Sequence, residues 1–162
     1  MRKNLVLMLS AVGALSFSSA YAGERVPVKG TYTGIDKSQV LELGKNHKII
    51  SVINEGLGYV LEAPGDATPL HLSTGPCGGV MEIKDGRGVG TGYCVRTNPA
   101  GGKWLLKWEI DPDLSKGRTG KWEITGIEGN TLGWKGGGTW GPVINTLPGK
   151  FINQFVGWLE KP

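Results

Sequence analysis

The sequence predicts an all-β protein, a single eight-stranded antiparallel β-barrel with one disulfide. Beyond residue 22, no stretch has a convincing apolar period of about 3.6 residues, which argues against amphipathic helices. The 28 glycines and 9 prolines interrupt the chain at intervals of about eight to twelve residues, as is typical of short strands joined by turns. A strand–turn–strand segment near the middle also contains both cysteines. About eight strands can close a barrel around side chains or one small ligand, and a β-sandwich is the alternative.

The strand–turn–strand segment lies within residues 76–110 and turns at Asp85-Gly86, a dipeptide that favours two-residue hairpins. Lys84 then pairs with Arg87, and the same register places Cys77 opposite Cys94. Across such a non-hydrogen-bonded pair the Cα atoms are about 4.5 Å apart, a distance that a disulfide spans. We therefore expect a Cys77–Cys94 disulfide, which stabilises the fold by about 3 kcal/mol in the chain-entropy model.

The hairpin register also places a stripe of alternate glycines on the face that carries the cysteines. The glycine stripe consists of Gly88, Gly90 and Gly92. If residues 98–102 form a five-residue loop, Thr97 pairs with Lys103 and Trp108 lies beside Gly92. A loop one residue shorter would reverse this assignment. The glycine stripe has a structural interpretation, in which tryptophans cover bare backbone, and a functional one, in which it leaves space for a ligand.

The remaining elements follow from apolar alternation and turn residues. Residues 35–45 read as a polar connection or a short helical turn, and residues 55–56 as a tight turn between two strands. Residues 63–69, 111–117 and 141–149 read as loops, and residues 128–129 as a turn. Besides the two hairpin strands, the expected strands are 26–33, 47–54, 57–62, a short edge at 70–72, 104–110, 118–127, 131–140 and 151–159.

The N-terminus has the features of a secretory signal peptide. Basic residues Arg2 and Lys3 precede an apolar run that is too short to cross a membrane, and cleavage is expected after Ala22. We expect residues 1–22 to be removed and residues 23–162 to form one β-barrel domain that is periplasmic or secreted. Loss of Arg2 and Lys3 lowers the formal charge from +4 to +2, which argues against binding to nucleic acid or a membrane surface.

Four residues are candidates for acid–base or hydrogen-bonding chemistry. Glu82 and Glu62 each lie within an apolar run. A glutamate that points into a dry barrel would have a raised pKa and could act as an acid or base, whereas one that points outward is an ordinary solvated residue. Tyr93 shares a face with Glu82, and His71 lies between two leucines. No metal site is expected, because the chain has too few histidines and cysteines.

Aromatic residues are candidates for contact with an apolar ligand. All six tryptophans lie in the C-terminal half, where they contribute to the core or form the wall of a pocket. The residues expected to contact a ligand are Trp108, Trp122, Trp134 and Tyr59.

Several motifs together resemble a known family. They are Cys77-Gly78-Gly79, Asp85-Gly86, Gly92-Tyr93-Cys94-Val95, the loop 98–102, Trp108, Gly120-Lys121-Trp122 and Gly137-Gly138-Thr139-Trp140. This pattern resembles exported bacterial members of the allene oxide cyclase barrel-like superfamily, which also includes the plant dirigent proteins. The resemblance implies an eight-stranded barrel with an apolar cavity. In the plant cyclases a buried glutamate and polar residues that hold a water guide an epoxide through cyclisation.

These features lead to three functional hypotheses. The first is an exported barrel that binds a small hydrophobic molecule in its cavity. The second is a cofactor-free isomerase or lyase that acts on an apolar epoxide or a related substrate, with Glu82 or Glu62 as acid or base and Tyr93 or His71 as hydrogen-bond donor. The third is an adhesion or inhibitor module that acts through its loops. No cofactor is expected, and the oligomeric state stays open between monomer and trimer.

Overall fold

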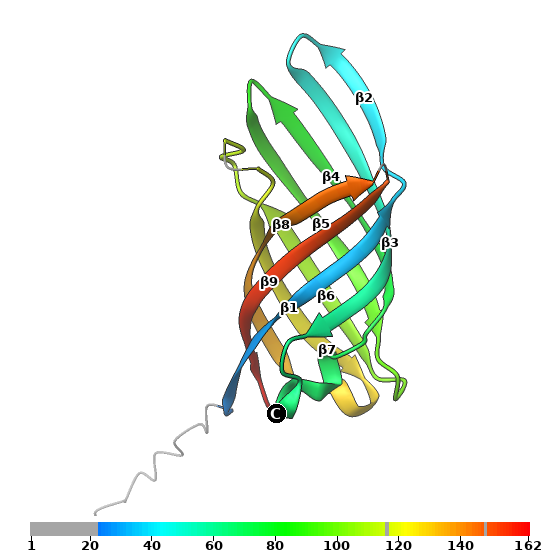
Figure 1. Ribbon diagram of the computed structural model, residues 1–162, viewed down its shortest axis with the longest axis vertical. Helices are drawn as coiled ribbons and strands as arrows, with labels where there is room; N and C mark the ends of the chain where they lie inside the picture. Colours follow the sequence, from blue (N-terminus) through cyan, green and yellow to red (C-terminus); the bar gives the residue numbers. More distant parts are fainter. Residues whose placement is uncertain (1–22, 116, 148) are drawn as a thin grey trace, which may run out of the picture.

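The computed structural model describes residues 23–115, 117–147 and 149–162, which form an all-β antiparallel sheet (Figure 1). The expected signal peptide, residues 1–22, lies outside the described residues. The strands are β1 (Arg25–Asp36), β2 (Gln39–Gly44), β3 (His47–Leu61), β4 (Gly75–Lys84), β5 (Arg87–Thr97), β6 (Lys103–Ile110), β7 (Gly120–Glu128), β8 (Lys135–Leu147) and β9 (Lys150–Glu160). Two 3₁₀ helices, η1 (Gly65–Leu70) and η2 (Gly129–Thr131), complete the described elements.

Eight of the strands close into a ring. From β3 to β9 each strand pairs with the next along the chain, and β1 pairs with both β9 and the second half of β3. The first half of β3 pairs instead with β2, so that this hairpin projects beyond the ring (Figure 1). The predicted eight-stranded antiparallel barrel is thereby confirmed.

The central hairpin has the predicted register. Lys84 pairs with Arg87 and Cys77 with Cys94, and the two cysteines form a disulfide with their Cα atoms 4.0 Å apart. The turn residues Asp85 and Gly86 have φ values of 50° and 77°, the left-handed conformation that a type I′ turn requires. The next register is also confirmed, since Thr97 pairs with Lys103 and Gly92 with Trp108.

The prediction of a tight turn at residues 55–56 is wrong, because β3 continues through these residues. A β-bulge occupies this position instead: Thr33 pairs with Gly58 and Gly34 with Gly56, which leaves one additional residue on β3. A bulge shifts the alternation of side chains by one residue. As a result, the buried residues change from Ile50 and Val52 before the bulge to Tyr59 and Leu61 after it.

Three further boundaries differ from the prediction. Residues 35–45 are not a polar connection, because β1 extends to Asp36 and β2 follows. The short edge strand predicted at residues 70–72 is wrong, since η1 ends at Leu70. Much of the predicted loop 141–149 belongs to β8, which pairs with β9 through two irregularities.

Large aromatic rings inside the barrel lie directly over glycine backbone. A Cβ atom added to Gly79 would lie 2.4 Å from Trp108, and one added to Gly157 would lie 2.7 Å from Trp122. The same relationship holds between Gly34 and Phe151. Inward glycines therefore provide the room that the rings occupy, as the structural interpretation of the glycine stripe predicts.

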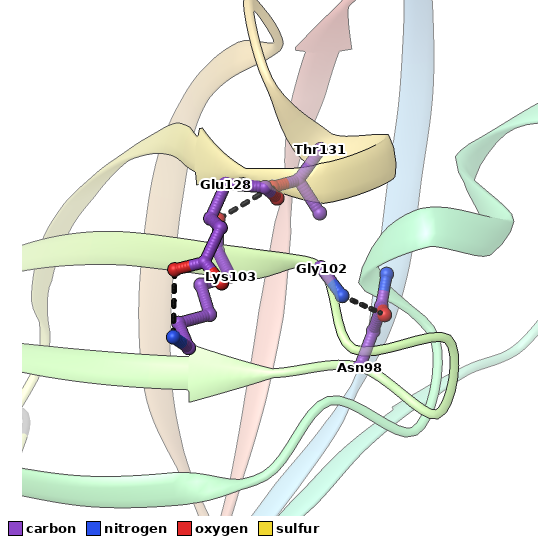
Figure 2. A network of polar contacts seen from close by, with 5 residues as sticks. All are labelled: Asn98, Gly102, Lys103, Glu128 and Thr131. Carbon is purple, nitrogen blue, oxygen red and sulfur yellow. Dashed lines mark hydrogen bonds and ion pairs between the residues drawn. The ribbon is translucent and has the colours of Figure 1, made fainter.

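One end of the barrel is closed by a packed core and a polar network. Trp104 has no exposed surface, and its indole N–H donates to the Pro69 carbonyl of η1 at 3.0 Å. Figure 2 shows the loops at this end. Asn98 accepts a hydrogen bond from the Gly102 N–H at 2.8 Å, and the buried Thr131 hydroxyl donates to backbone carbonyls of Lys103 and Glu128. The Lys103 and Glu128 side chains form an ion pair of 2.6 Å. The packing and hydrogen bonds at this end therefore stabilise the fold.

Candidate functional site

A cavity of about 540 Å³ lies inside the ring, next to the closed end. Its wall is largely apolar, because the inward positions of the strands carry aromatic and aliphatic side chains and the disulfide. The aromatic members are Tyr32, Tyr59, Trp108, Trp122, Trp140, Phe151 and Phe155, and the aliphatic members include Val52, Met81 and Leu106. Such a wall suits a flat apolar molecule.

Polar residues of the wall gather where β1 ends and β9 begins. Asp36 and Ser38 lie two residues apart there, and the Ser38 N–H donates to the Asp36 carboxylate at 2.8 Å. The Asp36 N–H donates to the Gly149 carbonyl, also at 2.8 Å, which brings Lys150 to the same end of the cavity. Arg118, in the connection before β7, lines the wall as well. The cavity therefore has a polar rim at the end opposite the packed core.

A second polar group lies deeper, around the disulfide. Strand pairing positions it: Asn54 is opposite Cys77, Cys77 is opposite Cys94, and Tyr32 is opposite Tyr59 across the seam that closes the ring. The rings of Tyr32 and Tyr59 stack with their centroids 5.0 Å apart. The Tyr32 hydroxyl lies 3.5 Å from Cys77 Sγ and is the donor, because a disulfide sulfur carries no hydrogen.

Arg96 lies behind these two tyrosines and has no exposed surface. Its guanidinium carbon lies 4.8 Å from the Tyr32 ring centroid and 5.1 Å from that of Tyr59, within the range of cation–π attraction. One terminal nitrogen donates to the Gly75 carbonyl at 2.6 Å and the other to Cys77 Sγ at 2.9 Å. None of the ion pairs among the described residues includes Arg96.

Burial keeps both cavity phenols protonated. Removal from water raises the pKa of Tyr32 above its ordinary value, and the positive charge of Arg96 opposes that rise. The pKa of Tyr59 is raised more strongly by the same desolvation, again against the influence of Arg96. At neutral pH both groups are therefore hydrogen-bond donors.

Three of the predicted ligand-contact residues line the cavity. Trp108 and Trp122 lie on neighbouring strands and pair with each other across β6 and β7, and Tyr59 faces the cavity from β3. Trp134 lies elsewhere, at the closed end, where its ring meets that of Trp104 edge-on at 6.4 Å. Trp134 packs against the hydrophobic core there.

The four predicted chemical residues do not come together. Glu82 is about half exposed on the outside of β4 and pairs with His47 at 2.8 Å. Glu62 is half exposed and pairs with Lys29 at 3.1 Å. Tyr93 is 52% exposed, and the ring nitrogen Nδ1 of His71 accepts a hydrogen bond from the Leu61 N–H. The cavity wall, as far as the described residues form it, includes none of these four.

Sequence reasoning missed the polar group formed by Tyr32, Asn54 and Arg96. A signal for Arg96 was present, since it continues the alternation of Gly92 and Cys94 and therefore lies on the inward face of β5. Tyr32 and Asn54 depend on the closure of β1 against β3, and no local pattern specifies that pairing.

The residues described by the structure form no cluster of three or more His, Cys, Asp or Glu side chains that could hold a metal ion. No helix formed by these residues has the length and apolar character needed to cross a membrane. The disulfide is typical of proteins outside the cytoplasm.

Fold and cavity together define an eight-stranded antiparallel barrel with an aromatic interior. No family model matches the sequence, and neither does any curated protein. Among solved structures, the fold is similar to that of AbnU, described as an exo-specific intermolecular Diels-Alderase. The two share 15% sequence identity over 85% of this chain and 98% of that chain, with a TM-score of 0.51. At this identity the similarity establishes the barrel fold alone.

Proposed function

We propose that this protein is exported and binds a small, flat, apolar molecule inside its barrel. The cavity of about 540 Å³, with its mainly aromatic and aliphatic wall, carries the proposal. Pockets for small molecules usually measure about 300–1,000 Å³ and combine an apolar wall with a few polar groups. Export to the periplasm or beyond is supported by the disulfide and by the signal-peptide features of residues 1–22.

The arrangement of polar groups supports an orientation for the ligand. Its apolar body would lie between Trp108, Trp122 and Tyr59, which line the wall on three different strands. Charged residues of the rim, including Lys150 and Arg118, remain close to water. A ligand with one polar end would therefore enter with its apolar part leading or would place the polar end against the deep group at Tyr32.

A second candidate is a cofactor-independent enzyme, an isomerase or lyase acting on a reactive apolar substrate such as an epoxide. Two observations favour it: protonated Tyr32 borders an apolar cavity with the cation of Arg96 behind it, and the fold is similar to that of a Diels-Alderase. Glu82, Glu62 and Tyr93 are at least half exposed, so the donor for such a reaction is better sought in the cavity wall.

Binding is tested with the apolar fluorophore N-phenyl-1-naphthylamine and with quenching of tryptophan fluorescence. Val52 is buried and lines the cavity, so Val52→Phe adds volume inside it. The next residue, Ile53, is 43% exposed on the outer side, and Ile53→Phe is the matched control. We expect Val52→Phe to weaken binding about tenfold or more, because it fills the space that the probe occupies, and Ile53→Phe to leave it unchanged. Equal affinity of wild type and Val52→Phe would place the probe elsewhere and contradict the proposal.

A further inference from the structure

The charge of Arg96 is the least expected feature of the barrel interior. A buried cation is costly unless it is paired, and none of the ion pairs among the described residues includes this one. Its guanidinium contacts two aromatic faces, a backbone carbonyl and a disulfide sulfur. Its Nε is buried without a hydrogen-bond partner among the described residues. The positive charge is therefore only partly compensated.

Tyr32 lies between this charge and the cavity. Its ring covers the guanidinium, and its hydroxyl points to Cys77 Sγ at 3.5 Å. Sulfur is a weak acceptor, and that distance makes a weak hydrogen bond. Because Tyr32 lines the cavity, an oxygen atom of a ligand could replace the sulfur as a much better acceptor. The nearby positive charge would strengthen such a hydrogen bond by making the hydroxyl a better donor.

Asn54 adds a second polar side chain to the deep wall of the cavity. It lies opposite Cys77 in the strand pairing and lines the cavity with Tyr32. Its side-chain oxygen is buried and has no hydrogen-bond partner among the described residues. This oxygen is an acceptor, so a donor such as a bound water would satisfy it, and the carbonyl of a ligand would not.

We propose that the deep wall of the cavity binds the carbonyl oxygen of a flat, conjugated, otherwise apolar ligand, with the Tyr32 hydroxyl as donor and Arg96 as the positioning residue behind it. This inference rests on the proposed function and specifies its ligand class. A carbonyl group fits because it is an acceptor without charge, so it can enter an apolar cavity at moderate cost. A phenol backed by a cation also stabilises negative charge that develops on a carbonyl oxygen, so the same contact would activate a conjugated carbonyl compound.

The test compares two ligands of nearly the same shape. 2-Acetonaphthone carries a carbonyl group, and 2-isopropenylnaphthalene carries a carbon–carbon double bond in its place. We expect wild type to bind the ketone about tenfold more tightly than the hydrocarbon, once both affinities are corrected for transfer from water to an apolar solvent. Tyr32→Phe should abolish this preference and leave affinity for the hydrocarbon unchanged. Tyr93→Phe removes a hydroxyl from the outer surface and is the matched control.

The outcomes separate this inference from the proposed function. If wild type binds both compounds equally well, or if Tyr32→Phe weakens both to the same degree, the carbonyl contact is wrong although the cavity still binds apolar molecules. If neither compound binds, and N-phenyl-1-naphthylamine does not bind either, the proposed function fails and this inference fails with it.

The role of Arg96 is read from the bound ketone itself. A carbonyl that accepts a strong hydrogen bond has a lower stretching frequency, which isotope-edited infrared spectroscopy measures for labelled 2-acetonaphthone. We expect the carbonyl frequency to fall on binding to wild type and to fall less on binding to Arg96→Met. Arg96→Lys keeps the charge, so the frequency with this variant should lie between those two values. If the ketone bound to folded Arg96→Met has the same carbonyl frequency as the ketone bound to wild type, the proposed role of Arg96 is wrong. Should Arg96→Met fail to fold, Arg96→Gln replaces it, because this variant removes the charge and keeps polar hydrogen-bonding groups. A carbonyl frequency in Arg96→Gln equal to that in wild type would then overturn the role of Arg96.

Discussion

A Cβ atom on Gly92 would lie 2.4 Å from Cζ2 of Trp108, so the indole ring rests on bare backbone. The same atom would lie 2.3 Å from the Gly78 carbonyl oxygen. Trp108 in turn forms part of the cavity wall. The shape of the cavity therefore depends on the absence of a side chain at this position.

Gly92→Ala should destabilise the protein by about 2 kcal/mol, because neither the ring nor the neighbouring strand can accept a methyl group without moving. Urea-induced unfolding measures this loss. Gly78→Ala is the matched control on the paired strand: the nearest atom to its added methyl group would be the Val52 carbonyl oxygen at 3.9 Å. The control should change stability by less than about 0.5 kcal/mol. Equal losses in the two variants would show that Trp108 does not restrict position 92.

Removal of the disulfide should cost about 3 kcal/mol, because Cys77 and Cys94 close a loop with a sequence separation of 17 residues. The variant Cys77→Ala/Cys94→Ala tests this by denaturant unfolding under oxidising conditions. Since one missing sulfur already breaks the bond, Cys77→Ala alone should lose nearly as much as the double variant. Additive losses from the two single variants would contradict a shared bond.

The hairpin from β4 to β5 could be predicted because its determinants are local. Asp85-Gly86 specifies the turn, and the two cysteines confirm the register at the far end of the hairpin. The path of β3 could not be predicted in the same way. Glu55-Gly56 has the residues of a tight turn, but pairing with β1 across the barrel seam converts this position into a bulge. Long-range pairing therefore overrode a local turn signal.

The candidate site was predictable only in part, for the same reason. Trp108 follows from the hairpin register, and Arg96 could have followed from it. Whether Glu82 points inward or outward was open in the sequence, and the structure places it outside, opposite the face that carries the disulfide and Met81. Tyr32 meets the Cys77 sulfur only because the two ends of the sheet join. Sites built across a barrel seam are poorly specified by local patterns.

Alkaline pH should destabilise the protein through Tyr59. Burial raises the pKa of this phenol in the folded chain. Its contribution to stability is complete below the ordinary tyrosine pKa of about 10 and is lost progressively as the pH rises above that value, since the unfolded chain then releases the proton first. We expect Tyr59→Phe to lose less stability than wild type between about pH 10 and 12. Tyr93, exposed on the outer surface, provides the control: Tyr93→Phe should follow the wild-type pH dependence.

Acid should weaken the junction of three strands at Glu160. Its carboxylate accepts hydrogen bonds from Arg25 of β1 at 3.1 Å and pairs with Lys135 of β8 at 3.3 Å. Hydrogen bonds from Arg25 and Lys135 lower the pKa of Glu160. A lowered carboxyl pKa stabilises the fold above the ordinary value of about 4.3, and this stabilisation is lost as the pH falls through the lowered pKa.

Glu160→Gln should therefore be less stable than wild type at neutral pH, and the difference should shrink as the pH falls, because wild type alone loses the charged contact. Denaturant unfolding at a series of acidic pH values measures the gap. The control is Glu62→Gln, which removes a half-exposed ion pair with Lys29 and should have little effect at any pH. A gap between wild type and Glu160→Gln that stays constant down to strongly acidic pH would mean that the ionised carboxylate does not hold β1, β8 and β9 together.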